Sequence, residues 1–523
     1  MAKLLYLGIK NKRVYFILLL IFRNFARKDL LSIIKLSKSY MKGLDVRSNP
    51  MVAIGVLLVL GIWAGRSWCD GDMAMWLVAT FVVIAIVAYL LRSRRHISSI
   101  LTGMAVFITG MLVETVSLKV EEDALSKGKE DYEAVVMTEP EVHGKVVQME
   151  LLVLRPERDN VWVRASVLRD TVQHRQDQLH VGSGIKAWSK IERGRNRLTT
   201  FIPCSSWQFA KVDLHRLTIL QRQRMLLAGV RQHLSDVFAN QAVVRAMVLG
   251  DKSQLSSELR DDYSRSGASH LLALSGLHIG IIYGLLMCIV FFAKRQWFTQ
   301  AVVLLVVWGY AVLVGLMPSV VRSACMITIY SLVSMTEGRR RSINVLALAA
   351  VVMLFVSPDS LWDLGFQMSF LSVLSILIIT PKLLYPFRNT SLKSNVVARW
   401  VLSMFAVTIA AQLGTSPLVA YVFGRLPVYG VLFNLVAVPL AMCVVCLTVL
   451  CLLFIWQPWM LTHLRIVVSW LSDILNQLVG FVSSLPGATV EVQPSLLQVV
   501  LCYVVLASLL CLSQYFIKVS PET

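Results

Sequence analysis

Charged residues are scarce in this chain: Asp, Glu, Lys and Arg make up 16% of its 523 residues, while 56% are hydrophobic. A soluble domain usually carries about 25% charged residues, so this composition excludes an ordinary soluble protein. Uncharged runs such as residues 301–317 and 431–454 are long enough to cross a hydrocarbon core about 30 Å thick. Because water cannot satisfy the backbone at that depth, these runs must be helices.

Acidic residues are especially few, with 31 Asp and Glu against 51 Lys and Arg, which leaves a formal net charge of +20. Nucleic-acid binding is one explanation, and the enrichment of Lys and Arg in the cytoplasmic loops of membrane proteins is another. When the predicted spans are threaded, basic loops at residues 294–295, 339–341 and 382–393 fall on the same side as the basic N-terminus. We therefore attribute most of the excess to topology and expect a cytoplasmic N-terminus.

Signals for cofactors and disulfides are also sparse. No nucleotide-binding P-loop is present, and we expect no cofactor. The C-x-x-C at Cys443 and Cys446 lies in an apolar run without a neighbouring His or acid, which favours packing over metal or redox chemistry. Cys69 and Cys204 fall in segments that we expect outside the membrane, where a disulfide between them is possible.

The predicted fold class is a polytopic α-helical membrane protein with an inserted small β-barrel domain outside the membrane. Six parts follow one another: a basic leader over residues 1–48, transmembrane helices over 49–115, the β domain over 118–217, an amphipathic surface helix over 218–245, a second transmembrane domain over 246–517, and a tail over 518–523. We expect spans at 51–65, 75–91, 97–113, 270–293, 298–317, 318–335, 343–356, 361–380, 397–423, 431–454 and 495–517. Residues 461–485 fit either a span or a surface or re-entrant helix.

The β domain is predicted from alternation of apolar and polar residues. Val147, Met149 and Leu151 would share one face of a strand, and Val163, Ala165 and Val167 repeat the pattern. Further on, basic residues alternate in a way that puts them on one face if the segment is extended, either as a solvated edge or as a DNA contact: Arg193, Arg195 and Arg197.

An amphipathic helix is predicted over residues 216–238, because apolar residues recur there at helical spacing. We expect it to lie on the outer surface of the cytoplasmic membrane. Its apolar residues are Leu226, Val230, Leu234 and Phe238, and Arg222, Arg224 and Arg231 face or flank the polar side.

The densest group of polar residues at membrane depth lies in residues 267–280, GASHLLALSGLHIG. A spacing of eight residues puts His270 and His278 on one helix face, two turns apart, with Ser275 near the same face. Gly276 and Gly280 form a G-x-x-x-G pattern, which lets a neighbouring helix approach closely.

Four interpretations of this group stay open. Ser275 and His278 are a possible nucleophile and base, although no acid is nearby in sequence to orient the histidine. His270 and His278, with Asp363, are a possible metal site. Polar groups that only join helices, and a polar pore lining, are the other two.

Further polar residues recur in the later spans, and together they would enclose a polar path. Arg322 follows Pro318 at a helix start, and we expect it to pair with Asp363. The remaining members are Gln367, four residues after Asp363 on one predicted helix, Gln412 with Pro417, and Asn434 with Pro439.

The sequence resembles the ComEC family of competence proteins, which are DNA-internalisation channels. The resemblance covers roughly residues 48–517. It begins with Asn49-Pro50, and its most specific part is Leu249-Gly250-Asp251 followed by residues 269–278, SHLLALSGLH. Residues 318–322 (PSVVR), residues 363–370 (DLGFQMSF), Gln412 with Pro417 and Asn434 with Pro439 then match in the family's order.

The resemblance implies a channel that passes a single DNA strand across the cytoplasmic membrane in natural transformation. It also implies that the β domain is OB-like and meets the DNA first, with Trp188, Trp162 and Tyr132 as candidate stacking residues. The implied partners are single-stranded DNA, an outer DNA receptor, a cytosolic helicase or strand-binding proteins, a separate nuclease, membrane lipids and a possible second copy of the chain.

One departure from the family concerns nuclease activity. Many members continue into a metallo-β-lactamase-like domain, whereas no H-x-H-x-D-H motif occurs in this sequence. We therefore expect a short form without enzyme activity. The alternative functions are a transporter of a small molecule or lipid on the same scaffold and an intramembrane hydrolase.

Overall fold

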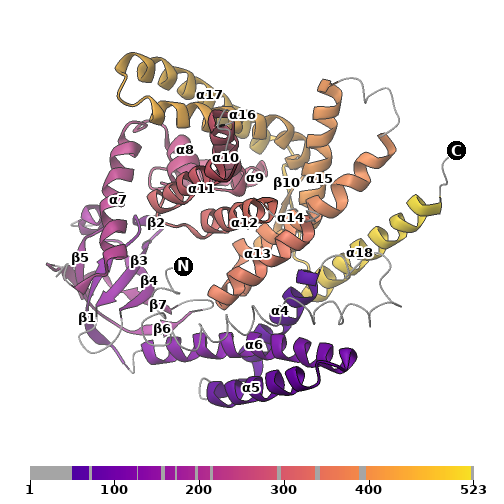
Figure 1. Cartoon of the computed structure of the whole chain (residues 1–523). Helices are drawn as coiled ribbons and strands as arrows, with labels where there is room; N and C mark the ends of the chain where they lie inside the picture. The colour runs from indigo at the N-terminus through magenta and orange to yellow at the C-terminus, as the bar shows by residue number, and fades with distance from the viewer. Residues whose placement is uncertain are drawn as a thin grey trace. The chain divides into compact units, whose positions relative to one another are not determined.

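The computed structural model divides the chain into two compact units, which are described separately. The N-terminal unit lies within Met1–Leu125, Thr328–Phe370 and Cys511–Thr523, and the main unit within Ser126–Ile327 and Leu371–Leu510 (Figure 1). The structure describes residues 50–69, 73–125, 128–154, 160–170, 174–194, 198–211, 216–290, 296–335, 342–387 and 396–519. The predicted leader therefore lies outside the described residues, as do the basic loops except for Lys382.

The N-terminal unit is built on three apolar helices, α4 (Pro50–Trp68), α5 (Ala74–Leu90) and α6 (Arg95–Ala124), together with α13 (Ser342–Val356) and the 3₁₀ turn η8 (Pro358–Trp362). Helix α6 runs eleven residues beyond the end predicted for the third span, at residue 113. The extension occurs because the polar residues after residue 113 continue the helix instead of starting the β domain.

Helices α4 and α6 cross at two glycines. A Cβ on Gly61 would lie 2.1 Å from the Phe107 carbonyl oxygen, and one on Gly110 would lie 2.5 Å from the Leu58 oxygen. No side chain fits at either position, so the two backbones touch there. Close approach through small residues is a usual way to pack helices in a membrane, where lipid removes the hydrophobic drive.

The β domain in the main unit is a curled, half-barrel sheet. Its strand order is β6-β7-β4-β3-β1-β5-β8, with β2 paired to β3, and all pairings are antiparallel except β4 with β7. The strands are β1 (Glu130–Val136), β2 (Glu141–His143), β3 (Val146–Leu154), β4 (Val161–Leu168), β5 (Gly184–Ser189), β6 (Ile191–Arg193), β7 (Leu198–Ile202) and β8 (Trp207–Phe209).

The predicted alternation decides which strand face is buried. Val147, Met149 and Leu151 of β3 are buried, and so are Val163, Ala165 and Val167 of β4. Gly182 turns the chain into β5 with φ +95°, a conformation that favours glycine. The expected fold class, helices in a membrane with an inserted β domain, is thereby confirmed.

A short helical segment joins the β domain to the helices of the main unit. Its elements are α7 (Ile219–Asp236), α8 (Ala242–Val244), the π turn η6 (Arg245–Leu249), α9 (Ser257–Arg265) and the 3₁₀ turn η7 (Ser269–Leu271). Thr218 and Gln221 form a capping box at the start of α7.

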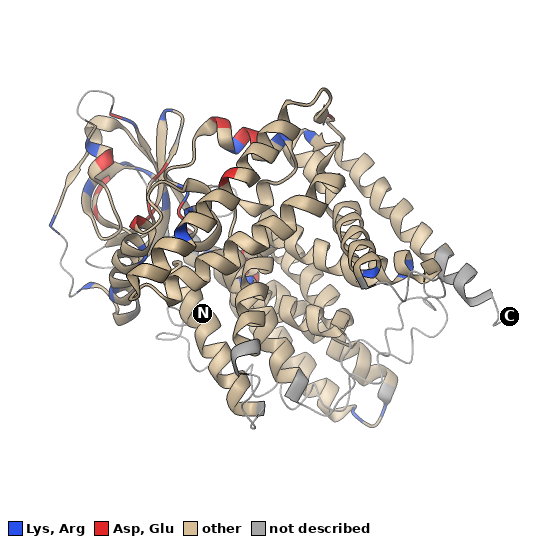
Figure 2. Cartoon of the chain, turned by 90° about the horizontal axis from the view of Figure 1, so that it is seen from above, with Lys and Arg blue, Asp and Glu red and all other residues tan. Residues whose placement is uncertain are grey.

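The remaining helices are apolar. They are α10 (Gly276–Val290), α11 (Gln296–Leu313), α12 (Pro318–Met335), α14 (Leu364–Leu384), α15 (Val396–Phe423), α16 (Gly430–Leu453), α17 (Pro458–Ser484) and α18 (Leu496–Val519). Within the described residues, six helices are long and apolar enough to cross a membrane: α4, α6, α14, α15, α16 and α17. In Figure 2 the helix bodies are almost free of charge, whereas Lys, Arg, Asp and Glu gather on the β domain and near helix ends.

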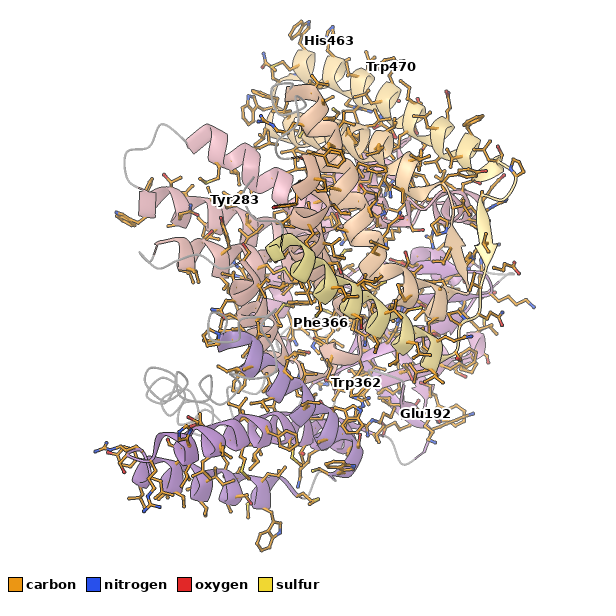
Figure 3. The ribbon with its side chains drawn as sticks, turned by 90° about the vertical axis from the view of Figure 1, so that its right-hand side faces the viewer. Glu192, Tyr283, Trp362, Phe366, His463 and Trp470 are labelled. Carbon is orange, nitrogen blue, oxygen red and sulfur yellow. The ribbon has the colours of Figure 1, made fainter. Side chains whose placement is uncertain are left out.

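Helix α17 returns alongside α16 to the level at which α16 began. Strand β9 (Arg425–Pro427) precedes α16 and pairs with β10 (Thr489–Glu491), which follows α17. Helices of 24 and 27 residues rise about 1.5 Å per residue, so each covers roughly 36–40 Å. Because α17 crosses the same depth as α16, the structure favours a span over a surface helix. Figure 3 shows His463 and Trp470 projecting from the exposed side of α17.

Candidate functional site

The two histidines of the densest polar group do not share a helix. His270 lies in the 3₁₀ turn η7, and α10 begins only at Gly276. The prediction of one continuous helix face from His270 to His278 is therefore wrong. The reason is local: Ala268 closes the preceding helix through a hydrogen bond to the Tyr263 oxygen, and Gly267 has φ +82°, so the chain turns before the next helix starts.

His278 caps its own helix. Its Nδ1 accepts a hydrogen bond from the Ser275 backbone N–H at 3.0 Å, the reciprocal half of a capping box. An accepting Nδ1 is unprotonated, so the neutral ring carries its proton on Nε2. The side chain is 1% exposed, and Nε2 has no hydrogen-bond partner among the residues that the structure describes. The site therefore holds one buried, neutral N–H donor.

This geometry gives little support to a nucleophile–base pair. Ser275 Oγ lies 3.4 Å from His278 Nδ1, beyond the roughly 2.6–3.2 Å expected of an activated nucleophile. The same nitrogen already accepts from the Ser275 N–H. Ser275 thus acts through its backbone, and its hydroxyl is secondary.

Only one glycine of the G-x-x-x-G pattern allows a close approach between helices. A Cβ on Gly276 would lie 3.1 Å from Ser323 Oγ, so α10 packs closely on α12 beside Arg322, which is buried. Gly280 has no atom within 4 Å of its Cβ position. The first turn of α10 is therefore the crossing point, and it brings the histidine motif against the Pro318–Arg322 motif.

The Gly250-Asp251 motif packs against both of these segments. Gly250 ends the π turn with φ +70°, and a Cβ there would lie 2.8 Å from Leu274 and 2.6 Å from Met317. π turns inside helices are common at functional sites. Three motifs that are far apart in sequence thus meet in one place.

Asp251 is held by a buried ion pair that sequence reasoning missed. Arg245 donates to Asp251 Oδ2 through Nε, at 3.0 Å, and through Nη2, while Ser235 Oγ donates to the same oxygen at 2.8 Å. Ser253 donates to Oδ1 through its N–H and its hydroxyl. Burial alone would raise the pKa of Asp251, but the hydrogen bonds from Ser253, Arg245 and Ser235 outweigh it and lower that pKa from 3.8 to about 2.

The late motifs meet the histidine segment from the other side. A Cβ on Gly267 would lie 3.0 Å from Pro427 and 3.1 Å from the Gly430 Cα, and one on Gly430 would lie 3.2 Å from Gln412 Nε2. Asn434, one turn further along α16, is 5% exposed. The predicted motif residues of the main unit therefore lie around the two ends of the segment from Gly267 to His278.

Helix α9 fixes this segment to its neighbours. Tyr263 donates to Asn476 of α17 at 3.0 Å, and Ser483 of α17 donates to Asp262 at 2.7 Å. Arg425 of β9 pairs with Asp261 at 3.0 Å. The start of the motif is thus anchored to α17 and to the β9–β10 pair.

Asp363 and Gln367 belong to the N-terminal unit. Asp363 lies just before α14 and accepts the Phe366 N–H at 3.0 Å, as a helix N-cap does. Gln367 donates to the Leu361 oxygen at 2.8 Å. The prediction that both lie on one helix is therefore wrong for Asp363. Its expected pairing with Arg322 joins the two units and stays a prediction.

The N-terminal unit also holds a charged cluster that the sequence did not reveal. Arg66 of α4 pairs with Glu114 of α6 at 3.1 Å and with Asp359 at 3.7 Å, and Ser117 donates to Asp359 at 3.0 Å. The Glu114 side chain is fully buried. The signal in the sequence is Glu114 itself, a lone acid at the end of an apolar run. The predicted span ends at residue 113, so Glu114 falls just outside it.

The structure describes only some of the β-domain residues that are predicted to contact DNA. Strand β6 ends at Arg193, which pairs with Leu198 at the start of β7. Arg195 and Arg197 lie outside the described residues. Trp188 is 47% exposed, with Lys129 Nζ 4.7 Å from its ring centre. Tyr132 is instead a core residue, and its hydroxyl lies 2.6 Å from Ser189 Oγ.

Metal and disulfide chemistry find no support in the described part of the chain. No group of three or more His, Cys, Asp or Glu there is placed to hold a metal ion. Cys69 and Cys204 are both free. The carbonyl oxygen of Cys204 accepts a hydrogen bond from Arg175 at 2.8 Å.

Comparison with known proteins places these motifs in a family context. The model of the family described as "Competence protein" matches residues 247–515. The chain is 24% identical to ComE operon protein 3 of Bacillus subtilis over 73% of its own length and 50% of the relative. It is 26% identical to Recombination protein 2 of Haemophilus influenzae over 38% of its length and 26% of that relative. No solved structure matches.

The share of the relatives that is covered limits the comparison. The chain spans about half the length of ComE operon protein 3 and about a quarter of Recombination protein 2. The matched region begins inside the π turn at residue 247 and contains every predicted motif from Gly250-Asp251 to Asn434. It leaves out the β domain.

Proposed function

Because this chain belongs to the competence-protein family, we propose that it passes a single strand of DNA across the cytoplasmic membrane in natural transformation. The observation that carries this proposal is the convergence of the family region's motifs. Gly250, Gly276 and Gly267 bring the π turn, α10, α12 and α16 to one place in a multi-pass membrane protein.

The residues at this place suit a polyanion that must move on. Arg322 offers a cation beside the α10–α12 crossing, and His278 offers a neutral N–H donor. A channel needs contacts that are strong enough to admit the strand and weak enough to release it. A buried cation with neutral donors, Gln412 and Asn434 among them, meets that need better than a dense basic cluster.

The β domain is the proposed first contact with the strand. OB-like folds bind single strands through basic grooves and stacked aromatics. Trp188 is the exposed aromatic that we assign to stacking, with Arg193, Arg195 and Arg197 as phosphate contacts. Cross-strand pairing puts Asp131 opposite Trp188, so the positive charge must come from Lys129 and the β6–β7 connection.

The proposed orientation puts the N-terminus in the cytoplasm and the β domain on the outer side. The proposed partners are single-stranded DNA, an outer receptor, a cytosolic helicase or strand-binding proteins, a separate nuclease and membrane lipids, with a possible second copy of the chain. We assign no enzyme activity to these residues.

Deletion of the gene tests the proposal. We expect transformation to be abolished while DNA still binds at the cell surface. Normal transformation in the deletion strain would overturn the proposed function.

Point variants test the site itself. We expect His278→Ala and Arg322→Ala to reduce transformation at least tenfold with unchanged protein in the membrane fraction, whereas His463→Ala and Arg465→Ala, both on exposed positions of α17, remain active. Ser275→Ala keeps the N–H that binds His278, so we expect it to be tolerated. If the single substitution Ser275→Ala abolishes activity, the alternative function of an intramembrane hydrolase is favoured instead.

A further inference from the structure

Helix α7 exposes a row of apolar side chains. Ile219 is 75% exposed, Leu226 is 73% exposed and Val230 is 47% exposed. Their spacings of seven and four residues place them on one side of the helix. An exposed apolar row of this kind marks an interaction surface.

The other two sides of α7 are occupied. On one side, Arg231 is buried and donates to the Val314 oxygen just beyond the end of α11, at 3.4 Å, and Ser235 donates to Asp251. Arg231, which the sequence predicts to face or flank the polar side, is therefore directed into the protein. On another side, Met225 packs in the core of the β domain with Leu217, and its Cε lies 3.0 Å from a Cβ position on Gly182.

Helical geometry separates these three sides. At 3.6 residues per turn, Met225 and Arg231 are roughly 120° apart, and each lies roughly 100–140° from Ile219, Leu226 and Val230. The apolar row therefore points away from both the β domain and the end of α11. It continues around the helix into Leu227 and Leu234, which are half-buried, so the apolar face is wider than the protein covers.

The position of α7 identifies what covers the row. Arg231 contacts the chain directly after α11, an apolar helix, and in Figure 1 α7 runs across that end of α11 rather than along it. The end of an apolar helix in a membrane protein marks the boundary of the hydrocarbon region. Of the arginines of α7, Arg231 is buried against the Val314 oxygen, whereas Arg222 is half-buried and lies next to the apolar row on the helix surface.

We propose that α7 is an interfacial helix whose row of Ile219, Leu226 and Val230 inserts into the headgroup–acyl boundary of the bilayer. Its apolar side enters lipid, while Arg222 beside that row favours anionic headgroups. The opposite side carries the β domain, which α7 thereby holds against the membrane surface. This proposal does not depend on DNA being the transported molecule.

Photo-cross-linking in native membranes tests the proposal. Benzoylphenylalanine is incorporated at Leu226 or Val230 of the full chain, with Gln232 as the matched control, because Gln232 is exposed on the other side of the same helix. The cells are fed a clickable fatty acid, so that lipid adducts are detected on the purified protein. We expect lipid adducts at Leu226 and Val230 at least fivefold above those at Gln232.

Two results would overturn the proposal. One is a cross-link from Leu226 or Val230 to a second copy of the chain or to another protein in place of lipid. The other is equal lipid labelling at Leu226, Val230 and Gln232. Each variant is first checked for a monodisperse elution profile in detergent that matches the unmodified protein.

Discussion

At the residue scale, Asp251 shows how a sequence motif acts through groups outside it. The motif contains the acid, but its partners Arg245 and Ser235 come from the π turn and from α7. Breaking a buried pair leaves the remaining charge uncompensated, which costs about 3–5 kcal/mol. The Leu249-Gly250-Asp251 motif thus has a structural role, because Asp251 joins the π turn to α7.

We expect the stability of the protein to depend on Asp251 at low pH. Its folded pKa, about 2, lies below the value of 3.8 for the free group, so its contribution is present above about pH 4 and is lost as the pH falls toward 2. The loss amounts to about 2 kcal/mol. The midpoint of thermal unfolding in detergent, measured between pH 2 and 6, checks this.

The matched comparison for that measurement is Asp251→Asn. We expect this variant to unfold at a lower temperature at pH 6 and to lose less between pH 4 and 2 than the wild type. Asp236, an exposed acid on α7, provides the control Asp236→Asn. An Asp251→Asn curve parallel to that of the wild type throughout would contradict the assigned role.

At the scale of elements, the crossing of α4 and α6 depends on glycine. A Cβ on Gly61 would meet the Phe107 carbonyl oxygen at 2.1 Å, and backbone cannot move aside as a side chain can. We expect Gly61→Ala to destabilise the protein by on the order of 1–3 kcal/mol, as overpacking does. Gly103→Ala on α6 is the control, because its Cβ would make only an ordinary contact at 3.5 Å with Leu57.

The measurement is again thermal unfolding, with both variants compared to the wild type at neutral pH. Gly103→Ala should be neutral or stabilising by up to about 1 kcal/mol, because alanine has the higher helix propensity. Equal destabilisation by the two substitutions would show that the crossing is not as close as the structure has it.

Helix positions followed well from hydropathy, since an uncharged run near 20 residues leaves few alternatives. Helix ends did not. Spacing predicts a helix through His270 because it cannot reveal the turn at Gly267. It predicts Asp363 inside a helix because an N-cap and a first-turn residue look alike in sequence. Glu114 was missed for a related reason. Its partner Arg66 is 48 positions away, and Asp359, the second acid that pairs with Arg66, is 293 positions from that arginine. One sequence carries no signal for such pairs.

Helix α17 gives a second prediction at this scale. Because β10 pairs with β9 while α16 and α17 run in opposite directions, Gln457 and Ser484 should lie on opposite sides of the membrane. Both are exposed, so Gln457→Cys and Ser484→Cys can be labelled with a membrane-impermeant maleimide in right-side-out and inverted vesicles. We expect opposite labelling patterns, with the wild-type chain as the background. Labelling of both cysteines from the same side of the membrane would instead show that α17 is a surface helix.

At the scale of the whole molecule, the net charge of +20 says less about DNA than its size implies. Much of it lies in the basic N-terminus and in loops that the predicted topology places in the cytoplasm, and the converging motifs contribute the buried cation Arg322 to the proposed path. The proposed specificity for a nucleic acid therefore rests on the combination of this path with the β domain. A transporter of a small molecule or lipid on the same scaffold would need the path but not the β domain.

Reconstitution separates these two functions. The purified full chain in liposomes should let a fluorescent single-stranded oligonucleotide added outside reach a nuclease-protected lumen, at least fivefold above liposomes carrying the Arg322→Ala variant. Duplex of the same length should stay outside, because the proposed path admits one strand. Since phosphate contacts weaken with salt, uptake should fall as ionic strength rises. If the liposomes instead take up a small polar solute and exclude the oligonucleotide at every salt concentration, the scaffold is a small-molecule transporter and the motif cluster serves that path.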